Sequence, residues 1–292
     1  MSASADYDLS AKFWIFTSMG IWASCSQVIL TVYILQLYVF KSKPSKLEYK
    51  LILFRVLLDA LNGASSVIFF SSSIPILVYN LSYDVSFVIG LVGQNLLEMR
   101  SFLAAIIAIE RALAATFPLS FYKWRSRISN WPIFILTAAF GISMLIVLFG
   151  VCDLQFPLAP GCNSVTCAVP TCYVTYGATT RVIYSSTNAL FSGVLCFKLF
   201  KLSVSVSVSA SKNTSKDFRK ANWLSLIDGL STVLFDLLPA VLYNRGIIVI
   251  TSHNPFMSSF RQLGRALEAA VMVVLMKKRS VVGTRTIGGV TG

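Results

Sequence analysis

The sequence has little charge, a single histidine and no closely spaced cysteine pair. Only 13% of its residues are charged, about half the fraction usual in a soluble domain. His253 lies outside the long apolar runs, and no two cysteines form a C-x-x-C motif. Structural zinc sites and intramembrane proteases need such cysteines or a histidine within a span. We therefore predict no metal site, no cofactor and no enzymatic activity.

Long hydrophobic runs dominate the sequence instead. Hydrophobic residues make up 55% of the chain, and the mean hydropathy is +0.72. A membrane-spanning helix needs about 20 mostly apolar residues, and residues 1–12 lack the basic start of a signal peptide. We predict an all-α membrane protein, a single seven-transmembrane helix bundle over 1–292, with spans at 13–40, 51–78, 87–117, 132–151, 182–202, 221–243 and 257–276 and a cytoplasmic tail at 277–292.

The basic residues indicate how the bundle is oriented. The net charge is +13, and the Lys and Arg residues cluster at the ends of the apolar runs. This arrangement favours a lipid bilayer over nucleic acid as the partner. Outside the spans, only Lys12, Arg181 and Arg245 fall on one side, and all other basic residues fall on the other. Because basic loops stay in the cytoplasm, we predict an external amino terminus and an internal carboxyl terminus.

The predicted outer side carries two covalent features. Asn80-Leu81-Ser82 is a glycosylation sequon at Asn80. The long polar segment 152–180 forms the second outer loop and holds four cysteines in an oxidising environment. Four cysteines allow three pairings, and the sequence does not choose among them. The candidate disulfide residues are Cys152, Cys162, Cys167 and Cys172.

Several ionisable side chains lie inside the predicted spans, where such groups usually face the bundle interior with a partner. Arg55 and Asp59 are four residues apart, so we expect them to share a helix face and to pair. Asp228 belongs to the sixth span. For these three residues we favour a structural role that holds the helices in register.

The seventh span carries a polar stripe at positions i, i+4 and i+7, formed by Arg261, Arg265 and Glu268. The two arginines repel each other unless an acid from another helix lies between them. We name Asp236 and Glu98 as the candidates for that acid.

A second polar patch lies on the outer half of the third span, at Gln94, Asn95 and Glu98. For Glu98, Asp236 and Arg261 we favour a ligand cavity over a purely structural network. The full set of candidate residues for a ligand cavity or polar network is Gln94, Asn95, Glu98, Asp236, Arg261, Arg265, Glu268, Arg55 and Asp59.

The third span ends in a Glu-Arg pair and continues into a short basic and aromatic segment, IERALAATFPLSFYKWR. This junction resembles the inner end of the third helix in rhodopsin-like G-protein-coupled receptors. Ala112 stands where those receptors have an aromatic residue. The resemblance implies a rhodopsin-like seven-transmembrane architecture and a switch that engages a heterotrimeric G protein. The implied switch and coupling residues are Glu110, Arg111, Pro118, Leu119, Tyr122, Arg125 and Arg127.

More narrowly, the whole chain resembles the nematode chemosensory serpentine receptors, and class BC in particular. The stretches that carry the resemblance are NLLEMRSFLAAIIAIERALAATFPLSFYKWR, LIDG, FDLLP and LGRALEAAVMVVLMKK. This family resemblance implies a receptor for a small-molecule cue, bound in the outer half of the bundle. It further implies a location in the plasma membrane, in particular that of sensory cilia.

The sequence also departs from the rhodopsin-like pattern. Ser86 and Phe87 occupy the outer end of the third span, where a cysteine is usual, so we expect any disulfide to lie within the second outer loop. Asp236 and Leu237 replace the usual Cys-Trp pair, and no Asn-Pro-x-x-Tyr motif ends the seventh span. That span has no lysine before Lys277, which excludes a retinal Schiff base.

One alternative of a different class stays open. The charged stripe of the seventh span would also suit a ligand-gated channel or a transporter, although the two halves of the chain show no repeat. The sequence also leaves open the identity of the ligand and whether the protein acts as a monomer, a homodimer or a heterodimer.

Overall fold

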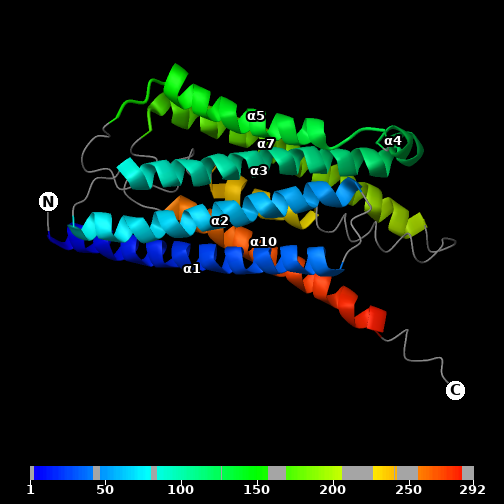
Figure 1. The fold of residues 1–292 in the computed structure, drawn as a ribbon, viewed down its shortest axis with the longest axis horizontal. Coiled ribbons are helices and arrows are strands. Elements are labelled where there is room, and N and C mark those ends of the chain that lie inside the picture. Colours follow the sequence, from blue (N-terminus) through cyan, green and yellow to red (C-terminus); the bar gives the residue numbers. More distant parts are fainter. Residues whose placement is uncertain are drawn as a thin grey trace.

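The computed structural model is an elongated bundle of long helices that run side by side (Figure 1). It describes residues 3–41, 47–79, 84–125, 127–156, 169–205, 226–239, 241 and 256–284, and these ranges contain no β-strand. A backbone in lipid must satisfy its own hydrogen bonds, which is why apolar runs of this length fold as helices. We refer to the end of the bundle at which α1 and α3 begin as the outer end, following the predicted orientation.

The helices alternate in direction along the chain. Two short π-helical segments, η1 and η2, occur among them. The elements are α1 (Ala3–Lys41), α2 (Leu47–Tyr79), α3 (Asp84–Thr116), α4 (Pro118–Arg125), α5 (Trp131–Ile146), η1 (Val147–Val151), α7 (Thr171–Ser205), η2 (Val233–Leu237) and α10 (Phe256–Thr284).

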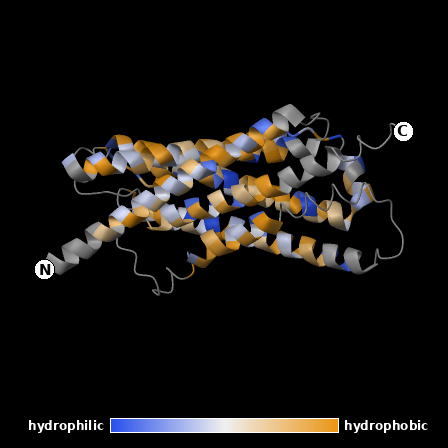
Figure 2. Cartoon of the chain, turned by 90° about the horizontal axis from the view of Figure 1, so that it is seen from below, coloured by the Kyte–Doolittle hydropathy of each residue, from blue (hydrophilic) through white to orange (hydrophobic). Residues whose placement is uncertain are grey.

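Helix α3 runs through the middle of the bundle. It packs on α2 along one side and on α5 and α7 along the other, while α1 packs on α2 and α10, and η2 contacts α7 and α10. Large apolar side chains such as Trp22, Ile29 and Leu190 are each more than 60% exposed. Figure 2 shows hydrophobic residues along most of the helix length, with hydrophilic residues midway along the bundle and at its ends. An apolar outer surface of this kind is suited to lipid contact.

By length and composition, three helices in the described part of the chain are apolar enough to cross a membrane. Their candidate spans are Phe13–Leu37, Lys50–Ile76 and Trp131–Val151. Helices α3, α7 and α10 are also long, with 33, 35 and 29 residues, but they carry more charged and polar side chains. Several of these side chains, including Glu98, Arg100, Arg265 and Glu268, are buried inside the bundle, which lowers the hydropathy of the helices without exposing charge to lipid.

Two segments that the sequence predicted as loops contain helix. Part of the basic segment after α3 forms α4, with Pro118 as its first residue, a position where the missing N–H of proline costs nothing. Helix α7 begins at Thr171 instead of residue 182, and the hydroxyl of Thr175 donates to the carbonyl oxygen of Thr171 at 3.0 Å. The prediction ended the helix where hydropathy falls, but a polar helix can continue beyond the bilayer.

One disulfide links the outer ends of two helices. It joins Cys152, just after η1, to Cys172 in the first turn of α7, with the two Cα atoms 5.7 Å apart. This bond excludes the two other pairings of the four candidate cysteines. Cys162, Cys167 and the sequon residue Asn80 lie outside the described residues.

Apolar clusters fill the two ends of the bundle. The outer cluster contains Phe69, Phe87 and Leu148 from α2, α3 and η1. Two inner clusters lie between α1, α2 and α10 and between α2 and α3. The polar layer described next lies between these apolar regions.

Candidate functional site

Five buried ionisable residues form what we call the central network: Arg55, Asp59, Arg100, Asp228 and Glu268. Arg100 of α3 donates from Nε to Asp59 Oδ1 at 2.9 Å, and from Nη2 to Asp228 Oδ1 at 3.1 Å and Glu268 Oε2 at 2.6 Å. Arg55 of α2 donates from Nη2 to Asp228 Oδ1 at 2.6 Å and also pairs with Glu268. Each residue is at most 7% exposed. The central network therefore ties α2, α3, α10 and segment 226–239 together.

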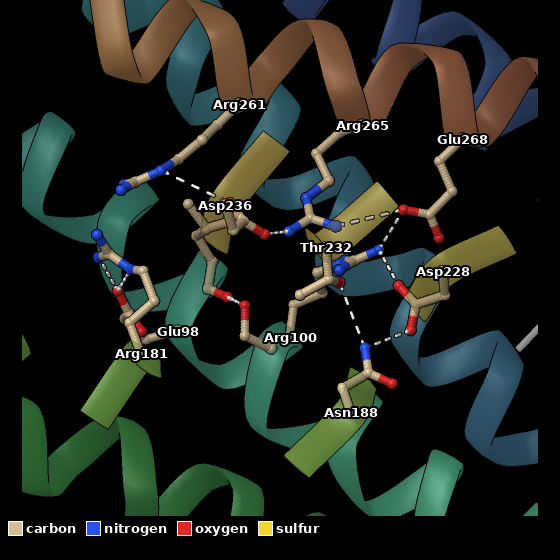
Figure 3. Close-up of polar contacts among 12 residues, drawn as sticks. Glu98, Arg100, Arg181, Asn188, Asp228, Thr232, Asp236, Arg261, Arg265 and Glu268 are labelled. Atoms are coloured by element: carbon tan, nitrogen blue, oxygen red, sulfur yellow. Dashed lines mark hydrogen bonds and ion pairs between the residues drawn. The ribbon is translucent and has the colours of Figure 1, made fainter. Parts of the chain in front are cut away.

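Neutral polar side chains extend the central network to the two remaining neighbouring helices. Gln27 of α1 donates to the backbone oxygen of Asp59 at 2.8 Å. Asn188 of α7 donates to Asp228 Oδ2 and to Thr232 Oγ1, both at 3.3 Å (Figure 3). Helices α1 and α7 are thus held to the same buried layer.

A second set of charges, which we call the outer group, lies nearer the outer end: Glu98, Arg181, Asp236 and Arg261. Asp236 in η2 pairs with Arg265, which also donates to Glu268 Oε2 at 3.3 Å and so connects the two sets. Arg261 Nε lies 3.6 Å from Asp236 Oδ1, too far for a hydrogen bond (Figure 3).

The close approach of α10 to η2 depends on a glycine. A Cβ atom at Gly264 would overlap the ring of Phe235. The absence of that atom lets η2 bring Asp236 against the two arginines of α10. A π-helical turn often occurs at a functional site, and nothing in the local sequence predicted this one.

Glu98 is held on one oxygen only. Gln94 donates to Oε1 at 2.8 Å, and Arg181 donates to the same atom from Nε at 3.1 Å and from Nη2. Glu98 is 1% exposed, yet its Oε2 has no hydrogen-bond partner, and neither does Arg261 Nε. The outer group therefore contains one unpartnered acceptor and one unpartnered donor.

In the central network, the charged groups with an unpartnered atom also make other strong hydrogen bonds. Arg55 Nε and Arg100 Nη1 lack partners, but each of these guanidinium groups makes strong bonds through its other nitrogens. A cavity of about 10 Å³ beside Asp59, Arg265 and Glu268 is near the minimum volume for one water molecule. The two sets and Arg265, which connects them, together hold five acids and five arginines, so their formal charges balance.

The structure brings together most of the residues that the sequence nominated, but with different partners. The predicted pair of Arg55 with Asp59 is wrong: Arg55 contacts Asp228 and Glu268, and Asp59 pairs with Arg100. A same-helix spacing permits a pair, but groups from neighbouring helices lie closer here.

Among the candidate residues nearer the outer end, some have the predicted partners and others do not. Asp236 does lie between Arg261 and Arg265. Glu98 pairs instead with Arg181, which the sequence had assigned to the outer side as a loop charge. Asn95 donates to the backbone oxygen of Gly141 at 3.1 Å and so faces α5.

Sequence reasoning missed the central position of Arg100 and the involvement of α7. A signal for α7 was present, because its polar residues follow helical spacing on one face. Three of them are buried, at 3%, 2% and 5% exposure. The stripe comprises Arg181, Ser185, Asn188 and Ser192.

At the inner end, one arginine joins the end of α3 to the segment before α5. Arg125, in the last turn of α4, pairs through Nε with Glu110 Oε1 at 2.8 Å. It also donates from Nη1 to the Ile128 backbone oxygen at 2.9 Å and bonds the side chain of Asn130. We call these contacts the inner clamp. Arg111, next to Glu110, is 6% exposed.

The outward face of α4 is apolar and basic. Leu119 is 88% exposed, Phe117 and Trp124 are each 60% exposed, and Arg127 is exposed just beyond the helix. Pro118 is exposed as well, and the Tyr122 side chain lies outside the described residues. Large apolar groups with this exposure mark a surface suited to a partner or a membrane.

These features define a class of protein. The described residues form a helical bundle with a lipid-suited surface, a buried layer of paired charges and a Glu-Arg pair near the end of α3, as expected of a helical membrane protein. The family model described as serpentine type 7TM GPCR chemoreceptor Srbc matches residues 9–280. The chain belongs to this family and is a membrane-embedded chemosensory receptor, which confirms the resemblance and the predicted fold class. No curated protein matches the chain.

Proposed function

We propose that this receptor binds a small-molecule cue in the outer half of its bundle and signals to a heterotrimeric G protein at its inner end. One observation carries the proposal. The single continuous helix α3 holds Glu98 of the outer group, Arg100 of the central network and Glu110 of the inner clamp. A displacement of α3 at the outer group would therefore also change the contacts of Arg100 in the central network and of Glu110 in the inner clamp.

The mechanism follows from how these contacts compete. A cue that contacts Glu98, Arg181 or Arg261 changes the relative position of α3, α7 and α10. The cue shifts the receptor toward an active arrangement only to the extent that it binds that arrangement more tightly. At the inner end, loss of the Glu110–Arg125 pair would free α4 from α3 and change the surroundings of Arg111.

Helix α4 supplies the surface that we assign to the G protein. Leu119 extends away from the bundle, and an exposed apolar side chain of this size is suited to a pocket on a partner. The neighbouring basic residues Lys123 and Arg127 would attract an acidic partner. Basic side chains at this level also suit anionic lipid headgroups, so the apolar residue gives the more specific test.

The proposal is tested by expressing the receptor in cultured cells with a G-protein dissociation reporter and a panel of volatile and water-soluble cues. Wild type, Arg111→Ala and Leu119→Ser are compared with Lys50→Gln, an exposed substitution at the inner end. We expect a cue-dependent response that both test variants lose and the control keeps, at equal surface expression. A cue-gated current that persists in Arg111→Ala without any reporter signal would instead establish the channel alternative.

A further inference from the structure

The outer group holds two unpartnered atoms of opposite character. Glu98 Oε2 is an anionic acceptor, and Arg261 Nε is a cationic donor. A buried polar atom without a partner costs free energy comparable to a lost hydrogen bond, and more if the group is charged. A molecule that supplies both missing partners gains this free energy on binding.

The arginine side of the site is suited to a carboxylate. The guanidinium groups of Arg261 and Arg181 lie near enough for their positive charges to repel each other. Asp236, the only acid paired with Arg261 among the described residues, makes its close contact with Arg265 instead. An anion beside Arg261 would relieve the repulsion and accept a hydrogen bond from the free Nε–H. Arginine matches carboxylate geometry better than other cations do.

The glutamate side is suited to an ammonium group. Gln94 and Arg181 donate only to Oε1 of Glu98, which leaves Oε2 free. A ligand with a carboxylate alone would leave Oε2 unpartnered and would place a second negative charge near Glu98. An ammonium group supplies donors to Oε2 and removes that repulsion.

The charge balance of the buried layer favours a ligand without net charge. Five acids face five arginines when Arg265 is counted with the two sets, and each added net charge must be taken out of water at a large cost. A zwitterion adds one charge of each sign and keeps the balance.

The helices that carry the outer group also carry aromatic side chains, which are suited to contact with an apolar body. Phe235 of η2 and Phe260 of α10 pack with ring centroids 5.0 Å apart, next to Asp236 and Arg261 in sequence. Tyr184 of α7, three residues after Arg181, packs on Phe102 and Phe140 with ring centroids 5.5 and 5.2 Å apart.

We propose that the outer group binds a free amino acid with an apolar side chain, its carboxylate at Arg261 and its ammonium group at Glu98. This inference names the ligand of the cue site in the proposed function and rests on that site. It assigns no role to the inner clamp or to α4.

The first test needs only the wild-type receptor, purified into nanodiscs. Binding of each of the twenty protein amino acids is measured by its competition with the other amino acids for the receptor and by the rise it causes in the melting temperature of the receptor. The best ligand is then compared with its N-acetyl derivative and its carboxamide, each of which lacks one of the two charges. We expect an apolar amino acid to bind, and each derivative to bind about ten- to a hundredfold more weakly because one charge-assisted contact is lost. Binding of no amino acid, or equal binding of either derivative, overturns the proposal.

Two variants then assign the contacts. Glu98→Gln is expected to lose the preference for the ammonium group over the N-acetyl derivative. Arg261→Gln is expected to lose the preference for the carboxylate over the carboxamide. Lys50→Gln, remote and exposed, is expected to keep both preferences. If the two test variants kept both preferences as well, the site would be elsewhere.

This experiment separates the inference from the proposed function. Amino-acid binding without any G-protein response would sustain the inference and refute the coupling. A G-protein response to another cue, in a receptor that binds no amino acid, would sustain the coupling and refute the inference.

Discussion

The central network and the outer group are built from the same side chains in the same bundle, yet they are completed to different degrees. In the central network, Arg100 alone contacts three acids, which come from α2, α10 and segment 226–239. Arg55 Nε and Arg100 Nη1 lack hydrogen-bond partners, but both guanidinium groups make close ion pairs through their other nitrogens. In the outer group, Glu98 Oε2 has no partner, and Arg261, whose Nε also has none, lies 3.6 Å from its nearest acid. Buried ions are stable only when their hydrogen bonds are made. The comparison indicates that charges with close ion pairs to several helices hold the bundle together, and that the more weakly paired charges of the outer group are available to a ligand.

The comparison predicts its largest effect at Arg100. Arg100→Leu leaves Asp59, Asp228 and Glu268 with fewer positive partners inside the bundle. Removing one member of a buried ionic network costs about 3–5 kcal/mol, so we expect strong loss of surface expression. The melting temperature of whatever receptor is recovered should fall far below that of wild type. Normal expression and melting of Arg100→Leu would show that the central network does not hold the bundle together.

A smaller loss is expected at Asp236, the member of the outer group that pairs with the connecting residue Arg265. Asp236→Asn keeps the shape of the side chain but removes the charge that Arg265 and Arg261 share. Hydrogen bonds to charged groups contribute about 1.5–3 kcal/mol, and we expect destabilisation in that range, measured by thermal unfolding in detergent. The matched comparison is Asn95→Asp, which adds a carboxylate on the α5 side of α3. An Asp236→Asn protein as stable as wild type would separate the outer group from the central network.

Arg261 provides the sharpest contrast with Arg100. Both are arginines inside the bundle, but Arg261 makes no close ion pair, and its charge is repelled by that of Arg181. We expect Arg261→Gln to change stability by about 1 kcal/mol or less, while ligand binding is strongly reduced. Thermal unfolding and ligand displacement on the same sample measure both quantities. Equal destabilisation by Arg261→Gln and Arg100→Leu would contradict the division into two sets.

The smallest effect on stability is expected on α4. Leu119→Ser changes a side chain that is 88% exposed, and surface substitutions usually alter stability by about 0.5 kcal/mol or less. We nevertheless expect the G-protein response to fall severalfold, because the apolar contact with the partner is lost. Trp124→Ser, at 60% exposure, serves as the matched test of whether the loss is specific to position 119. Unchanged signalling in Leu119→Ser would remove α4 from the proposed coupling surface.

Part of the candidate site was predictable from the sequence because burial in a membrane constrains charges strongly. Arg261, Arg265 and Glu268 follow helical spacing, and a charged stripe of this kind must face the interior. The same reasoning named Asp236 and Glu98 as candidates for the acid between the arginines, and the structure places Asp236 there. It failed for Arg55 and Asp59, because the spacing on one helix says nothing about groups on the helices beside it.

Two errors in the predicted helices, the start of the fifth span and the missed α4, also arise from reading each segment on its own. Hydropathy placed the start of the fifth span at residue 182, so Arg181 was counted as a loop charge. In the structure it is inside α7 and pairs with Glu98. Helix α4 was also missed, because an eight-residue segment with low hydropathy gives no membrane signal.

The sequence alone establishes that this chain is a helical membrane bundle and that the charges within its apolar runs must face the interior. Both follow from the cost of placing backbone polar groups and ions in hydrocarbon, a cost that each residue incurs whatever its neighbours are. Only the tertiary structure decided which acid pairs with which arginine, and therefore which atoms remain free. That choice depends on the rotation and closeness of six helical segments, as at Gly264, where the missing side chain lets η2 reach α10.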